Sequence, residues 1–344
     1  MRHKLLPISA LVLSLLVGVH GQTPSPARQL SIDVRVTDKS GAPIRGLVES
    51  EFLLLQDNQP QTITAFQEVN ASAPAKTDPR VEAILIFDAI NSNYTTVSFE
   101  RTEIRKFLLA DSGELAEPVT LVALSNNGPV VLSDSSRDGN ALAAVYDKFQ
   151  TGLREFTRSQ GINGAEERFN LSLKAFDQLV DAIAAFPGRK LMIWISPGWP
   201  YLSGPGIQFS AKDQDNLFTS IVHDSTRLAE SHTTVYSIDP LGSGDSSTNE
   251  YFNEFTKGVT EPSRVVASNA ALQVHAVHTG GRAIYGTNDL SRAIADCVAD
   301  AANYYLLTFN EPAGAHPNEY HSLAVRVENG AAVVRTRTGY YAQP

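Results

Sequence analysis

Residues 81–88 have the sequence VEAILIFD, a nearly continuous apolar run that ends in an acidic residue. A run of this length without polar alternation is typical of a strand that is buried on both faces of a parallel sheet. Similar short apolar runs occur further along the chain, at residues 119–124, 191–195, 234–238 and 282–285. The first stretch therefore predicts the first strand of an α/β domain, and the later runs predict its neighbours.

Helical periodicity separates these runs. Apolar residues recur every three or four positions in several segments, first at Ile104, Phe107 and Leu108, and then near 138–150, 165–186, 211–231, 264–278 and 288–302. Residues 130–132 follow a turn at Asn126-Asn127-Gly128 and predict a short antiparallel partner for the second strand. Because strands that alternate with helices form parallel sheets covered on both faces, we predict an α/β fold with a doubly wound, mostly parallel, Rossmann-like sheet.

The two ends of the chain show the alternation of apolar and polar residues that is typical of half-buried β-strands. The alternating segments are residues 30–36, 52–55 and 63–69 near the amino terminus and residues 304–309, 322–327 and 332–338 near the carboxyl terminus. Each group is small for independent stability. We therefore predict that the two groups pair into one small antiparallel β-sandwich, which brings the ends of the chain together.

The first 21 residues have the features of a secretory signal peptide. Arg2 and Lys4 give a basic start, residues 8–19 are apolar but too short to span a bilayer, and Val19-His20-Gly21 places small residues at a cleavage site. We expect export to the periplasm or the extracellular space. No later stretch approaches about 20 apolar residues, so we expect no membrane span.

Composition limits the class of protein. The chain has 344 residues, of which 42% are hydrophobic and 19% are charged, so it can bury a sizeable core. Its formal net charge of −9 disfavours a nucleic-acid partner. The single cysteine, Cys297, cannot form an intrachain disulfide, and its apolar neighbours predict a buried thiol.

The predicted domain organisation places the α/β domain between the two β segments. Residues 70–80 are small, polar and rich in proline, which indicates a linker. The full division is a signal peptide at 1–21, a disordered lead-in at 22–29, a β module at 30–69, the linker at 70–80, the α/β domain at 81–302 and the second part of the β module at 303–342.

The order of strand, helix, strand, reversed edge hairpin and helix–strand repeats resembles a von Willebrand factor type A (VWFA) domain. From residue 30 to residue 342, the chain further resembles the VWFA-related proteins common in acidobacterial genomes. Those proteins share a Val-x-Val-x-Asp-x-x-Gly segment, here Val34–Gly41, and a closing Arg-x-Gly-Tyr-Tyr, here Arg337–Tyr341. The resemblance implies a protein-binding or cell-adhesion function.

A VWFA domain typically carries a metal-ion-dependent adhesion site (MIDAS), built from an Asp-x-Ser-x-Ser turn, a threonine and a second aspartate. Here Asp88 stands at the first position and Ser92 at the last, whereas Ile90 replaces the middle serine and Asn91 offers a substitute oxygen. Hydroxyl and carboxylate oxygens suit a hard cation such as Mg²⁺ or Mn²⁺. The resemblance therefore implies candidate metal ligands at Asp88, Asn91 and Ser92.

The rest of the MIDAS motif is degenerate. Pro197 occupies the place expected for the second aspartate, and Thr151 and Thr157 are the candidates for the threonine. Asp239 follows the next strand, which in the expected order lies about 10 Å from the first, so it would reach the cation only through water or a shifted loop. We expect Mg²⁺ or Mn²⁺ to bind weakly if at all. The alternative role of the first-strand residues is to cap the following helix or to order its loop.

An aromatic loop follows one of the predicted core strands. Residues 197–201 read PGWPY and lie at the carboxyl ends of the strands, the edge where open α/β sheets bind ligands. We expect Trp199, Tyr201 and Asp239, together with residues 88–94, to form a rim that binds a partner protein. Packing of the aromatic loop against the protein itself is the alternative.

Other constellations give weaker signals. His275 and His278 are three residues apart on a predicted helix and could share a zinc ion, but no glutamate completes a His-Glu-x-x-His motif. Ser196 lacks the flanking glycines of a hydrolase nucleophile, and no phosphate-binding glycine motif occurs. We therefore predict an exported, non-enzymatic binding or adhesion module. The alternative is an extracytoplasmic metal-dependent hydrolase that uses the same strand-end rim.

Overall fold

The computed structural model describes residues 28–70, 81–149, 161–200, 209–240, 251–312, 314–328 and 330–342. The predicted signal peptide, most of the lead-in and nearly all of the linker lie outside the described residues, as do Thr151, Thr157 and Tyr201. The division into domains therefore stays a prediction. No helix in the described part of the chain is long and apolar enough to cross a membrane.

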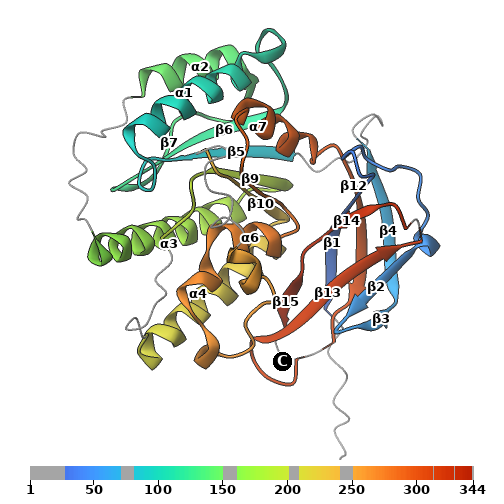
Figure 1. Cartoon of the computed structure of the whole chain (residues 1–344). Coiled ribbons are helices and arrows are strands. Elements are labelled where there is room, and N and C mark those ends of the chain that lie inside the picture. The colour runs from blue at the N-terminus through green and yellow to red at the C-terminus, as the bar shows by residue number, and fades with distance from the viewer. Residues whose placement is uncertain are drawn as a thin grey trace, which may run out of the picture.

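A seven-stranded sheet forms the centre of the larger part of the molecule (Figure 1). Its strands are β5 (Val81–Asp88), β6 (Glu114–Ser125), β7 (Gly128–Val131), β8 (Ser136–Asp138), β9 (Arg189–Ile195), β10 (Thr233–Ile238) and β11 (Ala283–Ile284). The main order is β11-β10-β9-β5-β6-β7, with β8 paired to β6. β7 and β8 run antiparallel to β6, and the other pairs are parallel. This is the strand order of a doubly wound sheet, with the reversed edge hairpin of a VWFA-like fold.

Helices cover both faces of this sheet (Figure 1). One face carries α1 (Tyr94–Leu108), α2 (Gly139–Lys148) and α7 (Leu290–Ala299), and the other carries α3 (Ile162–Ala184), α4 (Ala211–Glu230) and α6 (Leu272–His278). Leu85 and Phe87 of β5 pack on the α1 side, whereas Ile84 and Ile86 pack on the α3 side. Burial on both faces explains why this strand has so little polar alternation. The prediction of a doubly wound α/β sheet is confirmed.

Short 3₁₀ helices occupy several connections, namely η1 (Glu49–Glu51), η2 (Ala110–Gly113), η4 (Tyr251–Phe255), η5 (Pro262–Arg264) and η6 (Ala267–Ala270). The last two replace the first part of the helix predicted near 264–278, of which only α6 is α-helical. The Asn269 side chain accepts a hydrogen bond from the Val266 backbone N–H at 2.8 Å, which stabilises a non-helical turn. Val265 and Ala271 are extended, so α6 begins only after them.

Two four-stranded antiparallel sheets form the smaller part of the molecule, at the right of Figure 1. Their orders are β14-β1-β12-β4 and β15-β13-β2-β3. The bounds are β1 (Gln29–Thr37), β2 (Phe52–Gln56), β3 (Gln59–Gln61), β4 (Ile63–Asn70), β12 (Asn303–Asn310), β13 (Glu319–Val327), β14 (Val333–Arg335) and β15 (Gly339–Ala342). β12 lies between β1 and β4, and β13 pairs with β2, around a core that includes Ile32, Leu54 and Leu307. The predicted sandwich of strands from both ends is confirmed.

A tight turn at Asp57 and Asn58 joins β2 to β3. Both residues have left-handed φ angles, 49° and 62°, as a two-residue hairpin turn requires, and Gln56 pairs with Gln59 across it. The segment predicted as a strand at 63–69 is β4, which follows β3, crosses to the other sheet and pairs there with β12. The hairpin therefore closes one sheet, while the next strand contributes to the other.

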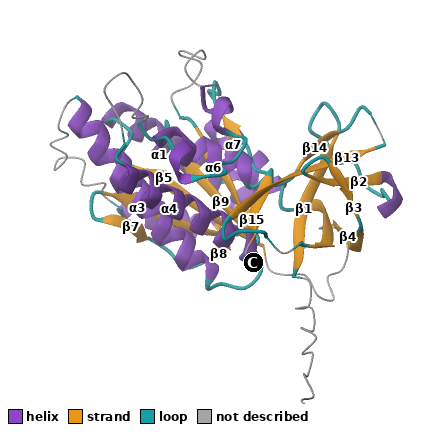
Figure 2. Ribbon diagram, turned by 90° about the horizontal axis from the view of Figure 1, so that it is seen from below, coloured by secondary structure: helices purple, strands orange, loops and turns teal. Residues whose placement is uncertain are grey.

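Buried arginines join the sandwich to the α/β part, and the two parts lie side by side in both ribbon views (Figures 1 and 2). Arg189 of β9 forms an ion pair with Asp33 of β1 at 2.7 Å. Arg35 of β1 donates hydrogen bonds to the carbonyl oxygens of Asp300 and Gly280. Because charge-assisted hydrogen bonds are directional, these contacts fix how the two parts are placed against each other.

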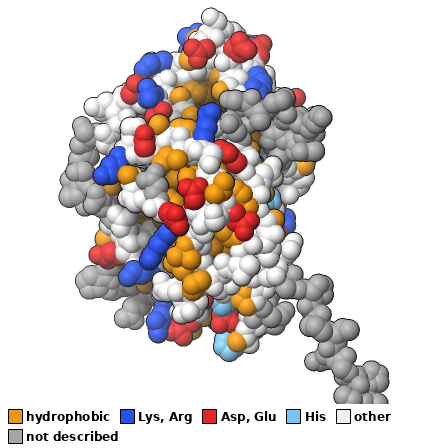
Figure 3. All heavy atoms as spheres, turned by 90° about the vertical axis from the view of Figure 1, so that its right-hand side faces the viewer, with side chains coloured by type: hydrophobic (Ala, Val, Ile, Leu, Met, Phe, Trp, Pro, Cys, Tyr) orange, Lys and Arg blue, Asp and Glu red, His pale blue; other side chains and the backbone are white. Residues whose placement is uncertain are grey.

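The outer face of the sandwich has a mixed character. Figure 3 shows hydrophobic side chains over the middle of this side of the molecule, with basic and acidic side chains around them. The exposed apolar residues of the sandwich include Val48, Leu53 and Val333. Apolar side chains scattered among charges are common on protein surfaces, so they carry no argument about function.

Candidate functional site

Asp88 ends strand β5 at the carboxyl edge of the central sheet, and its side chain is fully buried. Its Oδ1 accepts hydrogen bonds from the backbone N–H groups of Ile90 at 2.9 Å and Asn91 at 3.1 Å. Its Oδ2 accepts from the Asn91 amide at 2.7 Å and from the Ser196 hydroxyl at 2.8 Å. Burial raises the pKa of Asp88, and these hydrogen bonds oppose that shift. The carboxyl group therefore orders the loop that follows β5.

Asn91 connects this loop to helix α3. Its Nδ2 also donates to Ser172 Oγ at 2.9 Å, and its Oδ1 is buried without a hydrogen-bond partner among the described residues. The side-chain amide thus presents its N–H groups to Asp88, and not its oxygen. The residue that was expected to offer a substitute oxygen is here a hydrogen-bond donor.

A second buried carboxyl group, that of Glu100 in α1, lies beside Ser92. The Ser92 hydroxyl donates to Glu100 Oε1 at 2.8 Å, and Glu100 is 1% exposed. Burial, together with the charges of Asp88 and Asp239, raises the pKa of Glu100 well above its usual value. Glu100 is absent from the site predicted from the sequence. The sequence could have indicated it, because Glu100 lies four residues before Ile104 and therefore on the apolar face of α1.

Trp199 is buried, which corrects the expectation that it is an exposed anchor of the rim. It is 2% exposed and packs against Trp194 and Phe176, with ring centroids 5.7 and 5.5 Å away. Gly198 has a left-handed φ of 95°, and a side chain at this position would collide with Gln273. The backbone at Gly198 can therefore turn so that the indole of Trp199 points inward. The alternative expectation, that the aromatic loop packs against the protein itself, holds for Trp199.

Asp239 follows β10, two strands away from β5 as expected. It is 7% exposed, and its charge contributes to the raised pKa of Glu100. Tyr201 and residues 241–244, which were also expected at this rim, lie outside the described residues. The structure thus gathers buried acids at the strand ends, where the sequence suggested an open rim.

One exposed aromatic residue does lie at this edge. Tyr94 is the first residue of α1 and is 77% exposed. The helix begins there because Asn93 caps it, accepting a hydrogen bond from the Thr96 backbone N–H at 2.9 Å. Tyr94 belongs to the segment 88–94 of the expected rim, and the buried hydrogen bonds of Asp88 order the loop that leads to it.

The arrangement at Asp88 does not fit a MIDAS cation. A cation such as Mg²⁺ needs oxygen atoms at about 2.1 Å. The oxygens of Asp88 already accept hydrogen bonds, and the Ser92 hydroxyl is directed to Glu100. Within the described ranges, no group of three His, Cys, Asp or Glu residues could hold a metal ion. The contacts support the alternative role of Asp88, which is to order its loop.

We expect calorimetric titration of the metal-free protein to show no Mg²⁺ or Mn²⁺ binding tighter than about 1 mM. Asp88→Ala should instead lower the free energy of unfolding by about 1 to 3 kcal/mol, because buried donors lose their acceptor. Asp134→Ala, at an exposed position, should leave stability nearly unchanged. Micromolar binding that disappears in Asp88→Ala would contradict this prediction and restore a metal-dependent site.

Among the other candidate side chains, His275 and Cys297 are buried, and His278 is partly buried. Burial lowers the pKa of His275 to about 3 and that of His278 to about 4, so both imidazoles are neutral near pH 7. His275 packs on Phe176, with ring centroids 4.5 Å apart. Cys297 is buried as predicted, and burial raises the pKa of its thiol to about 12. An unreactive structural thiol is the consequence.

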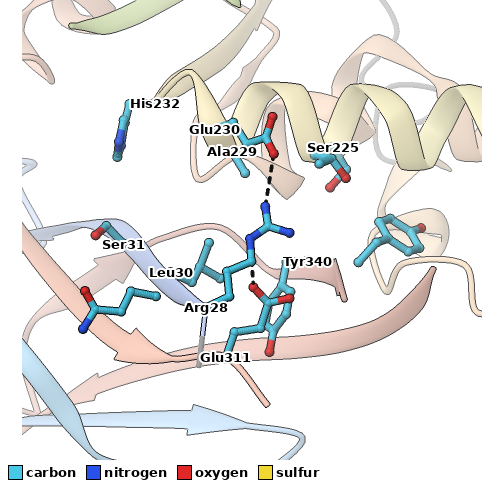
Figure 4. Close-up of a pocket in the computed structure, with 12 residues that line it drawn as sticks. Arg28, Leu30, Ser31, Ser225, Ala229, Glu230, His232, Glu311 and Tyr340 are labelled. Atoms are coloured by element: carbon cyan, nitrogen blue, oxygen red, sulfur yellow. Dashed lines mark hydrogen bonds and ion pairs between the residues drawn. The ribbon is translucent and has the colours of Figure 1, made fainter. Parts of the chain in front are cut away.

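A cavity of about 230 Å³ lies between α4 and the sandwich (Figure 4). Arg28 extends into it and contacts Glu230 of α4 at 3.1 Å and Glu311, just after β12, at 3.6 Å. Burial raises the pKa of Glu311, and the charge of Arg28 opposes this shift. Arg28 therefore connects an acid of the α/β part, Glu230, with an acid of the sandwich, Glu311. The cavity is part of the contact between these two parts of the molecule.

The strand order and the helical layers define the class of protein: a VWFA-like α/β unit joined to a β-sandwich. No family model matches the chain, and no curated protein matches its sequence.

Several solved structures match the chain at low similarity. The conserved hypothetical protein BatB from Bacteroides thetaiotaomicron has a TM-score of 0.32 and 13% identity, and the match covers 64% of this chain and 98% of that one. The human COPII-coat protein Sec24c has a TM-score of 0.34 and 11% identity, over 78% of this chain and 44% of that one. The pilus adhesin SpaC from Lactobacillus rhamnosus GG has a TM-score of 0.37 and 11% identity, over 85% and 48%. Similarity at this level carries no argument about function.

Proposed function

We propose that the chain is an exported protein-binding or adhesion module whose partner docks at the carboxyl edge of the central sheet, around Tyr94. The observation that carries this proposal is the 77% exposure of Tyr94, next to a loop ordered by the buried Asp88. An exposed aromatic side chain on an ordered segment can bury apolar area in an interface at low entropic cost. The carboxyl edge is also where open α/β sheets bind ligands.

We also propose that the chain is a VWFA-related protein, because two short motifs that it shares with that family have clear structural roles. The first is Val34–Gly41, in which Asp38 Oδ1 accepts hydrogen bonds from the Ser40 backbone N–H at 2.8 Å and the Ala42 backbone N–H at 3.0 Å. Gly41 has a left-handed φ of 89°. The aspartate and the glycine of the motif thus form the turn that ends β1.

The second motif is Arg337–Tyr341. The Tyr340 hydroxyl donates to Gln56 Oε1 at 2.9 Å in the sandwich. The Tyr341 hydroxyl donates to the Val259 carbonyl oxygen at 3.1 Å in the α/β part. The two consecutive tyrosines therefore connect the last strand to both parts of the molecule. This gives the motif a structural role, which is to hold the sandwich against the α/β part.

Export is proposed from the signal-peptide features of residues 1–21. Expression of the full chain in a bacterial host should yield protein outside the cytoplasm with Gln22 as its first residue. Mass spectrometry of the fractionated cells measures both properties. Full-length protein that keeps Met1 in the cytoplasm would contradict the proposal.

The docking edge can be tested by placing a photo-crosslinking amino acid at position 94. We expect covalent capture of a protein partner there, because the side chain at this position is exposed. Tyr94→Ala should weaken the captured partner's affinity by about tenfold or more, as for a central aromatic anchor, with little change in stability.

Phe186 supplies the matched control. It is 58% exposed and lies between α3 and β9, at the amino edge of the sheet. The same crosslinker at position 186 should capture no partner, and Phe186→Ala should leave affinity unchanged. Equal capture at both positions, or unchanged affinity of Tyr94→Ala, would refute the carboxyl edge as the docking surface.

A further inference from the structure

A cavity of about 660 Å³ lies between α7 and strands β1 and β14 of the sandwich. Arg282, which immediately precedes β11, and Asp300, which immediately follows α7, form part of its wall. Residues that precede a parallel strand or follow its helix lie at the amino edge of the sheet. The cavity is therefore separate from Asp88 and Tyr94, which lie at the carboxyl edge.

The walls of this cavity carry an excess of positive charge, although the whole chain has a net charge of −9. The basic wall residues are Arg35, Lys39, Arg282, Arg292 and Arg335, and the acidic ones are Asp38, Asp296 and Asp300. Two of the acids are engaged locally. Asp38 accepts hydrogen bonds within its own turn, and Asp296 pairs with Arg292 at 2.8 Å. Asp300 is then the wall acid that can offset the positive charges of Arg35, Lys39, Arg282 and Arg335.

Asp300 does not satisfy all of these bases. Its carboxylate accepts hydrogen bonds from Arg335 Nη2 at 2.8 and 2.9 Å and from the Tyr236 hydroxyl at 3.1 Å. Arg282 Nε forms a longer ion pair with the same carboxylate, at 3.7 Å, which is too far for a hydrogen bond. Arg282 Nε and Arg335 Nη1 are buried without a hydrogen-bond partner among the described residues. Lys39 is exposed and forms no ion pair with any of the residues that the structure describes.

A cavity wall on which two arginines share one carboxylate, beside a lysine without an ion pair, favours an anionic ligand. The side chains of Arg282 and Arg335 line the cavity and are 35% and 20% exposed, so a bound oxyanion can share these cations with Asp300. The cations come from three elements: Arg335 from β14, Arg282 from the segment before β11 and Lys39 from the turn after β1. A phosphate monoester offers three acceptor oxygens and a charge near −2. A carboxylate offers only two oxygens and one charge, so a phosphate matches this set of donors better.

The remaining wall of the cavity suits an organic group. It includes the apolar residues Pro43, Ala299, Ala302 and Val333. The volume of about 660 Å³ lies within the usual range of small-molecule sites, roughly 300 to 1,000 Å³. We propose that this cavity binds a small organic phosphate, with the phosphate on Arg282, Arg335 and Lys39 and the organic group on the apolar wall.

Calorimetric titration of the whole protein with phenyl phosphate tests this proposal. We expect saturable binding of one molecule per chain with a dissociation constant below about 1 mM. Arg282→Gln and Lys39→Gln should each weaken the affinity by about tenfold, because each removes a charged donor. Added NaCl should also weaken binding, since salt screens the attraction. Lys39 is exposed, so Lys39→Gln decides the question even if Arg282→Gln disturbs folding.

Arg264→Gln is the matched control, because Arg264 is 74% exposed at its side chain and pairs with Glu261 away from the cavity wall. Its affinity for phenyl phosphate should equal that of the natural protein. Equal weakening in Arg264→Gln, or full affinity in both cavity variants, would overturn the site. Absence of binding at about 10 mM phenyl phosphate would do the same. Benzoate that binds as tightly as phenyl phosphate would overturn the choice of a phosphate.

Discussion

A chain truncated after Ala302 should lose the fold of its amino-terminal strands. The truncation removes β12 to β15, so β1 and β4 lose the strand between them and β2 loses its pairing with β13. The apolar face that includes Ile32 and Leu54 would then meet water, and the new strand edges would be free to pair with other chains. We expect aggregation, or rapid proteolysis within residues 28–70.

A single substitution in β12 tests whether the amino-terminal strands need the core that β12 completes, without shortening the chain. Leu307 is fully buried in the sandwich core, whereas Asn310 is exposed at the end of the same strand. Leu307→Asp places a charge in the core and should cost more than about 4 kcal/mol of unfolding free energy. Asn310→Asp should cost almost nothing. Limited proteolysis with mass spectrometry compares the variants, and protease-resistant residues 28–70 in the truncated chain would refute the shared sandwich.

The central sheet could be predicted from the sequence because of how its strands are buried. All seven residues of β9 are buried, and β5 contributes to hydrophobic cores on both of its faces, so both strands are mostly apolar. Strand β15, Gly339–Ala342, shows no such pattern and exists because it pairs with β13. The placement of β4 in the sheet opposite to β2 likewise depends on its long-range pairing with β12. Long-range pairing of this kind leaves little trace in a local pattern.

The candidate site could be predicted only in part. The position of Asp88 at a strand end follows from the apolar run before it. The direction of Trp199 does not, because it depends on the conformation of one residue, Gly198. The contact between Ser92 and Glu100 depends on how α1 packs on the sheet, and so it needs the tertiary structure. Local patterns therefore located the strand end, and packing decided which side chains meet there.

A buried acid between α3 and α4 should make the protein less stable as pH rises. Asp224 of α4 is fully buried, and Asp177 and Asp181 of α3 are the neighbouring acids. Burial, and then the charge of Asp177, raises the pKa of Asp224 from an ordinary value of 3.8 to about 9. The nearby bases His223 and Arg227 contact Asp181 instead, at 3.0 and 3.4 Å. Asp224 is therefore protonated in the folded protein at neutral pH.

The sign of the effect follows from proton uptake. In the unfolded chain Asp224 loses its proton near pH 3.8, whereas in the folded protein it keeps the proton up to about pH 9. Between these values folding takes up one proton, so the free energy of unfolding falls by up to about 1.4 kcal/mol per pH unit. Below about pH 4 both states are protonated, and the contribution disappears.

Asp224→Asn should remove this pH dependence, because an amide of nearly the same shape does not titrate. We expect the variant to match the natural protein near pH 4 and to exceed its stability by on the order of 2 to 4 kcal/mol near pH 8, as measured by urea unfolding. Asp215→Asn, at an exposed position on the same helix, should keep the pH slope of the natural protein. If the curves for the natural protein and Asp224→Asn ran parallel, Asp224 would have to be ionised in the folded state. Its burial between two helices beside Asp177 would then have to be offset by a cation.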